Sequence, residues 1–128
     1  MNPVHHALSS VARYGGVLED YIEIHHWFDG SKRSSTDPRH RALRHHSEGI
    51  YDCEEKFGYA ITNSEGKLIP TRYIGEDHVK EDLGFIPCMM QWFEKIEMQK
   101  WMFMTNQVPK ETHESLMNNK PVQLKRSK

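Results

Sequence analysis

The chain has 128 residues, a formal charge of −1 and a mean hydropathy of −0.78. This length suits one domain, and the near-neutral charge excludes a surface built throughout for a phosphate backbone. No apolar run reaches the roughly 20 residues that cross a bilayer, and residues 1–15 lack the pattern of a signal peptide. We therefore expect a cytoplasmic protein without a membrane partner.

The first half of the chain has the apolar spacing of helices. The spacing predicts three of them, over residues 3–14, 17–29 and 38–57. The third begins with the capping residue Asp37 and with Pro38, and it ends before Gly58. Residues 17–29 are also rich in aromatic and β-branched residues, so a strand is the alternative there.

Beyond the third helix the pattern changes to that of a β-hairpin. Residues 59–62 and 67–74 indicate two short strands around the turn NSEG, and Pro70 places the second strand at an edge. A short helix over residues 76–83 and a C-terminal helix over 88–98 follow. The expected fold class is α+β, with three N-terminal helices, a short β-hairpin, then a short helix and a C-terminal helix.

The end of the chain differs from the rest in charge. Residues 107–128 carry five basic and two acidic residues, a local charge of +3, and have little apolar surface to bury. We expect a single α+β domain over residues 1–106 and a basic, flexible tail over 107–128. Binding to nucleic acid is expected only through this tail. Two cysteines are too few for a disulfide framework, so both are expected to be free thiols.

Nine histidines are an excess for this length, and six of them form three adjacent pairs on different predicted helices. On the second helix His25 and Asp29 are four residues apart, and so are His78 and Asp82 further along. Residues at this spacing share one helix face. His46 lies on the apolar face of the third helix. We expect the inward-facing histidines to meet.

Converging imidazoles and carboxylates are the ligands that zinc and its neighbouring transition metals use. We predict a site for Zn²⁺ or another divalent transition metal. Its candidate ligands are His6, His25, Asp29, His45, His46 and His78. A metal with an open coordination position would support hydrolysis, with Glu48 or Asp82 as candidate general bases. The pattern leaves open whether the site is catalytic or structural, or whether these histidines are hydrogen-bonded core residues.

Four stretches carry a family resemblance: HHALSSVARYGG, IHHWFDGSK, RHRALRHHSEGI and ITNSEGKLIPTRYIGEDHVKEDLGFIP. Together they resemble a family of small uncharacterised proteins of bacteriophage and bacterial genomes, catalogued as a domain of unknown function, over about residues 3–104. The resemblance implies a phage or prophage context and brings no established activity. Its recurrent polar positions correspond here to His6, His25, Asp29, His40, His45, His46, His78 and Asp82. His26 departs from the pattern, which weakens it as a ligand.

A phage context supports a second function class, a protein that binds and inhibits a host defence or transcription protein in the host cell cytoplasm. Trp101 and Phe103 are its candidate contact residues, because aromatic side chains carry much of the energy of interfaces. In this interpretation the histidines are structural. Packing in the core or in a homodimer is the alternative role for these aromatic residues.

Overall fold

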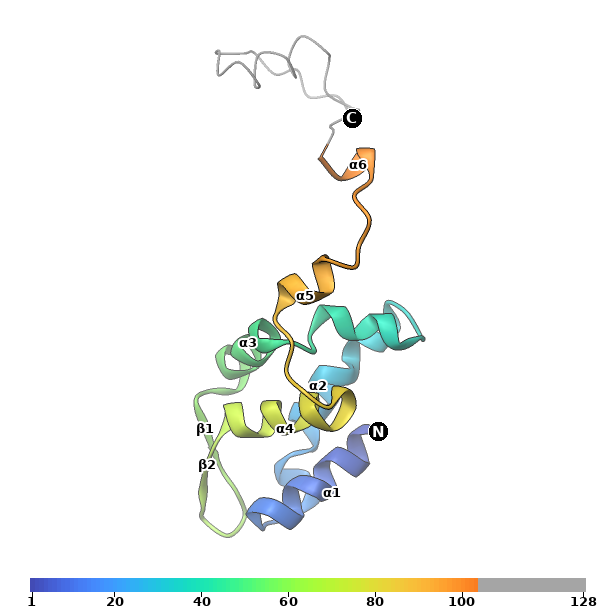
Figure 1. Ribbon diagram of the computed structural model, residues 1–128. Helices are drawn as coiled ribbons and strands as arrows, with labels where there is room; N and C mark the ends of the chain where they lie inside the picture. Colours follow the sequence, from blue (N-terminus) through green and yellow to red (C-terminus); the bar gives the residue numbers. More distant parts are fainter. Residues whose placement is uncertain (104–128) are drawn as a thin grey trace, which may run out of the picture. The chain divides into compact units, whose positions relative to one another are not determined.

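A computed structural model of the chain describes residues 1–103 (Figure 1). One compact unit runs from Met1 to Lys95, and a second begins at Ile96, of which the described part holds the short helix α6 (Lys100–Phe103). The first unit is helical with one β-hairpin, which confirms the α+β class. Among the described residues no helix is long and apolar enough to cross a membrane. The expected tail over 107–128 lies outside the described residues.

The first two predicted helices form at the expected places. α1 (Pro3–Tyr14) begins where the Asn2 side chain accepts a hydrogen bond from the backbone N–H of His5, with proline at the first helical position. The second segment is a 3₁₀ turn, η1 (Leu18–Asp20), followed by α2 (Ile22–Asp29). The helical interpretation of this segment, rather than the strand, is therefore confirmed. A further 3₁₀ turn, η2 (Gly30–Arg33), follows α2.

The predicted third helix over 38–57 is wrong as one continuous element. The structure has a 3₁₀ helix, η3 (Pro38–Leu43), and then a separate helix, α3 (Ser47–Phe57). Between them His46 has an extended backbone, and its side chain caps α3. The chain turns so tightly here that a Cβ at position 49 would overlap the Arg44 carbonyl, so Gly49 permits the break.

The hairpin is shorter than predicted, and the helix after it is longer. β1 (Ala60–Thr62) pairs antiparallel with β2 (Leu68–Pro70). Pro70 ends the second strand, and α4 (Thr71–Leu83) takes the residues assigned to the rest of that strand. The buried residues of α4 recur at helical rather than alternating spacing, because this segment packs against three helices, α1, α2 and α3.

The predicted C-terminal helix over 88–98 is also too long. Only α5 (Met89–Phe93) forms there, and none of its residues is fully buried. A short helix with no buried face gains little from packing, which is where most helical stability in proteins comes from. Helix α5 therefore ends after five residues.

The core of the first unit is half apolar and half polar. Its buried apolar residues are Ala7, Tyr21, Ile24, Phe28, Ile50, Cys53, Ile69, Ile74 and Val79. Six histidines are buried beside them: His6, His25, His40, His45, His46 and His78. Buried polar groups need partners, so the hydrogen bonds of these histidines decide what the core can do. Cys53 is a buried free thiol whose pKa burial raises to about 12, and Cys88 is a partly buried one.

Candidate metal centre

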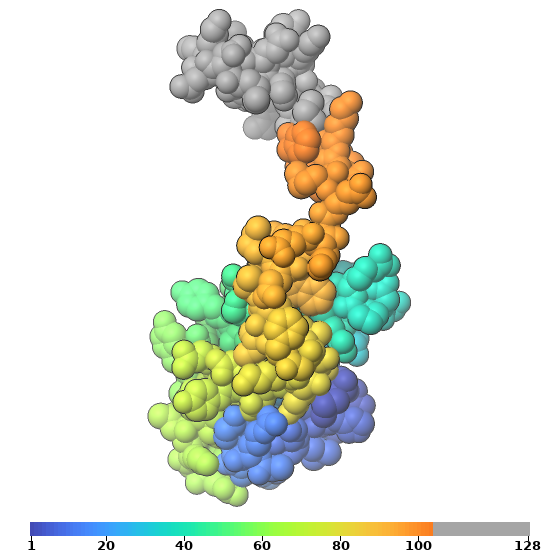
Figure 2. Space-filling view, viewed as in Figure 1, coloured from blue at the N-terminus to red at the C-terminus, as the bar shows by residue number. Residues whose placement is uncertain are grey.

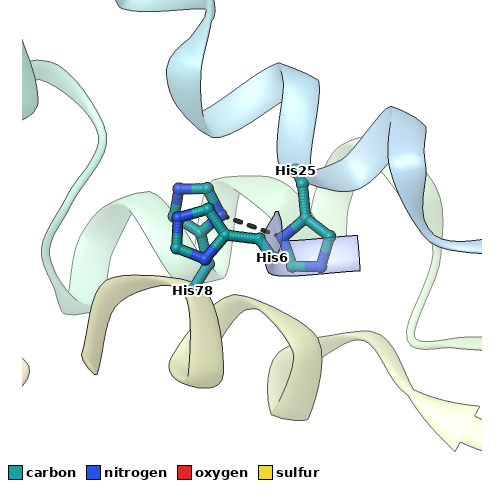
Figure 3. A group of neighbouring side chains, drawn as sticks. All are labelled: His6, His25 and His78. Carbon is teal, nitrogen blue, oxygen red and sulfur yellow. Dashed lines mark hydrogen bonds between the residues drawn. The ribbon is translucent and has the colours of Figure 1, made fainter. Parts of the chain in front are cut away.

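The predicted ligands come together from three helices and a turn. His6 lies on α1, His25 on α2 and His78 on α4, and Figure 3 shows their rings gathered between these helices. The His78 ring is stacked between His6, with ring centroids 3.8 Å apart, and Phe28, at 4.7 Å. This stacking fixes the plane of the His78 ring and therefore the direction of its two nitrogens.

Four of these side chains meet around one point. His78 Nε2 lies 3.3 Å from Asp29 Oδ1 and 3.4 Å from Asp82 Oδ2. His45 Nε2 lies 2.9 Å from Asp82 Oδ2 and 3.8 Å from Asp29 Oδ1. Each of the four residues offers one ligand atom within 4.8 Å of those of the other three. Their side chains are at most 6% exposed, so the group is almost wholly shielded from water.

Two of these four separations, both from His78 Nε2, are those expected of ligand atoms that share one ion. Bonds of about 2.0–2.1 Å in a tetrahedral site place neighbouring ligand atoms about 3.3–3.4 Å apart. A charge-assisted N–H to carboxylate hydrogen bond is shorter, at about 2.7–2.9 Å. The contact between His45 and Asp82 has that length, but His78 Nε2 lies at almost equal, longer distances from two carboxylates. The geometry around His78 therefore fits a shared cation.

A chain of hydrogen bonds on the far side of His78 determines the tautomer of its ring. It places the ring proton on Nδ1 and leaves a lone pair on Nε2, the nitrogen that faces the carboxylates. His78 Nδ1 lies 2.9 Å from His25 Nδ1, and His25 Nε2 lies 2.8 Å from Ser10 Oγ, which itself donates to the His6 carbonyl. Burial, with the neighbouring His78 and His6, lowers the pKa of His25 to about 2, so His25 is neutral. When its one ring proton is donated to Ser10, His25 Nδ1 accepts from His78 Nδ1–H. His78 Nε2 is then free to hold a cation.

The electrostatics of the group favour positive charge at that nitrogen. Burial alone would raise the pKa of Asp82, but hydrogen bonds from His45, His6 and His78 outweigh it and hold this pKa well below its usual range. Burial would lower the pKa of His78, yet its hydrogen bonds to Asp29 and Asp82 outweigh burial and raise it. Two ionised carboxylates thus face His78 Nε2, where a proton or a metal ion would balance them.

Two buried atoms of the group have no hydrogen-bond partner among the described residues. They are Asp29 Oδ2 and His45 Nδ1. A buried carboxylate oxygen without a donor is costly, and a bound cation is one way to satisfy it. Two imidazoles and two carboxylates are also a donor set that zinc accepts. The residues present therefore fit a transition-metal ion.

His6 contacts this group without completing it. Its Nδ1 lies 2.7 Å from Glu81 Oε1, and its Nε2 lies 3.1 Å from Asp82 Oδ1. His6, His25 and His78 also form a second group of the size that could hold an ion. In that group a hydrogen bond already joins His78 Nδ1 and His25 Nδ1, at 2.9 Å. We therefore assign His6 to orienting Asp82.

Three other contacts position the cluster. Trp92 Nε1 donates to the His45 carbonyl at 3.0 Å, which ties the turn before α3 to α5. Arg41 Nη2 lies 3.7 Å from Asp82 Oδ1, and the α-amino group of Met1 lies 3.2 Å from the same oxygen. In the space-filling view, residues of α1 (blue) and the end of α4 (yellow) adjoin at the surface (Figure 2). Arg13 of α1 also pairs with Glu81 of α4, with 2.9 Å between Nη1 and Oε2.

The structure does not bring every predicted residue to the cluster. His46 is fully buried, but its Nδ1 accepts from the Gly49 N–H and its Nε2 donates to the Ala42 carbonyl. Both its nitrogens thus serve the backbone, and His46 acts as the cap of α3. Glu48, a candidate general base, is half exposed and accepts from the Met89 N–H.

The remaining predicted residues are placed as follows. Asp82, predicted as a general base, lies among the ligands, where its spacing from His78 had put it on the same helix face. Trp101 and Phe103, the predicted partner contacts, are exposed on α6 in the second unit. Ser10 was not predictable from the sequence, because a serine within a helix carries no signal of its partner.

Comparisons with known proteins add a family but no activity. The model of the family described as Domain of unknown function (DUF6915) matches residues 1–102. The search of curated proteins and the search of solved structures each gave no match. What the site does must therefore be inferred from its own chemistry.

Proposed function

The chain belongs to the DUF6915 family, a domain of unknown function as the resemblance implied, and we propose that it is a metal-binding protein that holds one divalent transition-metal ion. The proposed ligands are Asp29, His45, His78 and Asp82. The observation that carries the proposal is the pair of near-equal distances, 3.3 and 3.4 Å, from His78 Nε2 to two buried carboxylates. A single hydrogen bond would bring the nitrogen close to one of them.

The donor set supports a transition metal over Ca²⁺ or Mg²⁺. Those two ions take oxygen ligands and keep bound waters, whereas imidazole nitrogen suits zinc, iron, cobalt and nickel. Zinc is the ion that we propose first. Zinc has no redox chemistry, and its structural sites are closed and have four ligands, as this site has. The burial of all four side chains matches this closed type of site.

Hydrolysis by the bound metal would require an open coordination position in addition to the ligands. A catalytic zinc keeps one position for water, so either Asp29 or His45, whose ligand atoms lie 3.8 Å apart, would have to leave the metal. Asp82 would then stay bound, and Glu48 lies outside the cluster. The geometry supports binding of the ion more directly than it supports turnover.

Elemental analysis of untagged protein purified without chelator tests the proposal. We expect about one equivalent of a single transition metal, lost in His78→Gln and in Asp29→Asn. His46→Asn is the matched control, since it changes a buried histidine outside the group and keeps a side chain that can cap α3. Metal that dialyses away from the wild type, or full metal content in both ligand variants, would contradict the proposal.

The chain behind His78 has its own test. Ser10→Ala removes the acceptor of the His25 ring proton and leaves all four ligands in place. Loss of such an outer partner typically weakens metal affinity by about 10–100-fold. Competition with a chromogenic chelator would measure the change, and an unaltered affinity would mean that Ser10 does not position His78.

A second function, inhibition of a host protein in a phage context, has one observation in its favour. Trp101 and Phe103 are 68% and 62% exposed. Large aromatic residues at such exposure are typical of binding surfaces. For this function we expect Trp101→Ala to abolish co-purification with a host protein and leave metal content unchanged. Co-purification that survives both Trp101→Ala and Phe103→Ala would count against it.

A further inference from the structure

A basic groove lies outside the metal centre, in the first unit. It has a volume of about 570 Å³, and three of the side chains that line it are cations, Arg33, Arg44 and Lys56. Within residues 1–103 none of the three forms an ion pair; the lining also includes one acidic residue, Glu23. Positive charge concentrated in a groove attracts anions.

The central cation of this groove is held in place. The Arg44 guanidinium lies over the Trp27 ring, 4.4 Å from its centroid, and Nη1 donates to the Trp27 carbonyl. Gly30 leaves room for it, because a Cβ there would come within 3.1 Å of Nη1. This is the one hydrogen bond that the guanidinium makes within the described residues, so Nε and Nη2 are free to donate. A fixed fork of donors is suited to phosphate oxygens.

The groove also has an apolar wall. Trp27 and Phe57 are both half-buried and line it, and the Lys56 ammonium lies 5.5 Å from the centre of the Phe57 ring. A volume of this size is within the range of small-molecule sites. Cations beside half-buried aromatic rings suit a ligand that combines phosphates with a flat ring.

From these observations we propose that the groove binds a nucleoside triphosphate, with the phosphates on Arg33, Arg44 and Lys56. The base lies against Phe57 and the edge of Trp27, because the Arg44 guanidinium already covers a face of the Trp27 ring. Three cations offset most of the charge of a triphosphate chain. The proposal does not depend on the metal centre, since no proposed ligand of the metal lines the groove.

Isothermal titration calorimetry on the full-length protein as purified, with its metal content unchanged, tests the proposal with three probes. These are adenosine triphosphate, inorganic tripolyphosphate and a short single-stranded thymidine oligonucleotide. We expect adenosine triphosphate to bind more tightly than tripolyphosphate, because only the nucleotide contacts the aromatic wall. Equal affinities would overturn the contact with the base. Tighter binding of the oligonucleotide, or no heat with any probe, would overturn the proposal as a whole.

Charge-neutral variants locate the site. Arg33→Gln and Lys56→Gln change exposed side chains and are expected to weaken binding of adenosine triphosphate about tenfold each, an ordinary loss for one charge-assisted contact. Arg39→Gln is the matched control, because Arg39 is exposed, pairs with Asp37 and does not line the groove. An equal loss in the control would mean that net charge alone holds the nucleotide, and would overturn the assignment. Binding that persists in His78→Gln separates this site from the metal centre.

Discussion

Replacing Asp29 by asparagine tests whether Asp29 is a metal ligand or an ordinary buried carboxylate. The substitution keeps the shape of the side chain and one oxygen but removes the negative charge. Asp29 Oδ1 makes the 3.3 Å contact with His78, and Asp29 Oδ2 has no hydrogen-bond partner among the described residues. Few interactions inside the protein itself therefore depend on this charge.

The expected change in the free energy of unfolding follows from these contacts. Without metal, the variant loses one long hydrogen bond to a charged group, which costs about 1.5–3 kcal/mol and is partly offset because a buried charge disappears. With metal, the wild type gains about 4 kcal/mol of stability when free metal is 1,000 times its Kd. For a domain of about 100 residues this corresponds to a rise in Tm of at least about 15 °C. The variant should lose nearly all of that gain.

Urea unfolding of both proteins, each with and without one added equivalent of zinc, measures the four free energies. We expect the wild type to gain several kcal/mol from zinc and Asp29→Asn to gain less than about 1 kcal/mol. A wild type that is equally stable with and without zinc would refute the metal site. A variant that gains as much as the wild type would refute Asp29 as a ligand.

Two further predictions concern the metal-free core and its thiols. Burial lowers the pKa of His25 and His45 in the folded protein. As pH falls below about 6.5, these histidines therefore take up protons in the unfolded chain and stay neutral in the folded one. The free energy of unfolding should then decrease by about 1.4 kcal/mol per histidine and pH unit. The pKa of His40 is also lowered and adds a third loss, whereas the raised pKa of His78 adds stability only as pH falls toward 6.5 and no further change below it. Urea unfolding at pH 6.5 and 5.5 measures the net change, and stability that increases toward pH 5.5 would contradict the prediction. Burial raises the pKa of Cys53 to about 12, so a thiol reagent should label the partly exposed Cys88 in the native protein and Cys53 only after unfolding. Rapid labelling of Cys53 in native protein would contradict its burial.

Local chemistry was enough to predict where several elements begin and which residues share a face. Asp37, followed by proline, begins η3 as predicted, because capping involves only neighbouring residues. The four-residue spacing of His78 and Asp82 put both on one face of a helix, and α4 holds them there. The hairpin turn likewise follows from its own residues. These features depend on contacts close in sequence, so they can be predicted without the fold.

Only the tertiary structure decided which histidines meet. His46 lies at a position that the apolar periodicity assigns to the buried face of a helix, as expected of a ligand. The chain breaks there instead, with Gly49 close to Arg44, and His46 becomes the cap of α3. The same break turns His45 toward Asp82, which is 37 residues away in the sequence. Asp29 joins them because α4 packs on α2. Convergence of this kind depends on how the helices pack, and periodicity along one helix carries no information about the face of another.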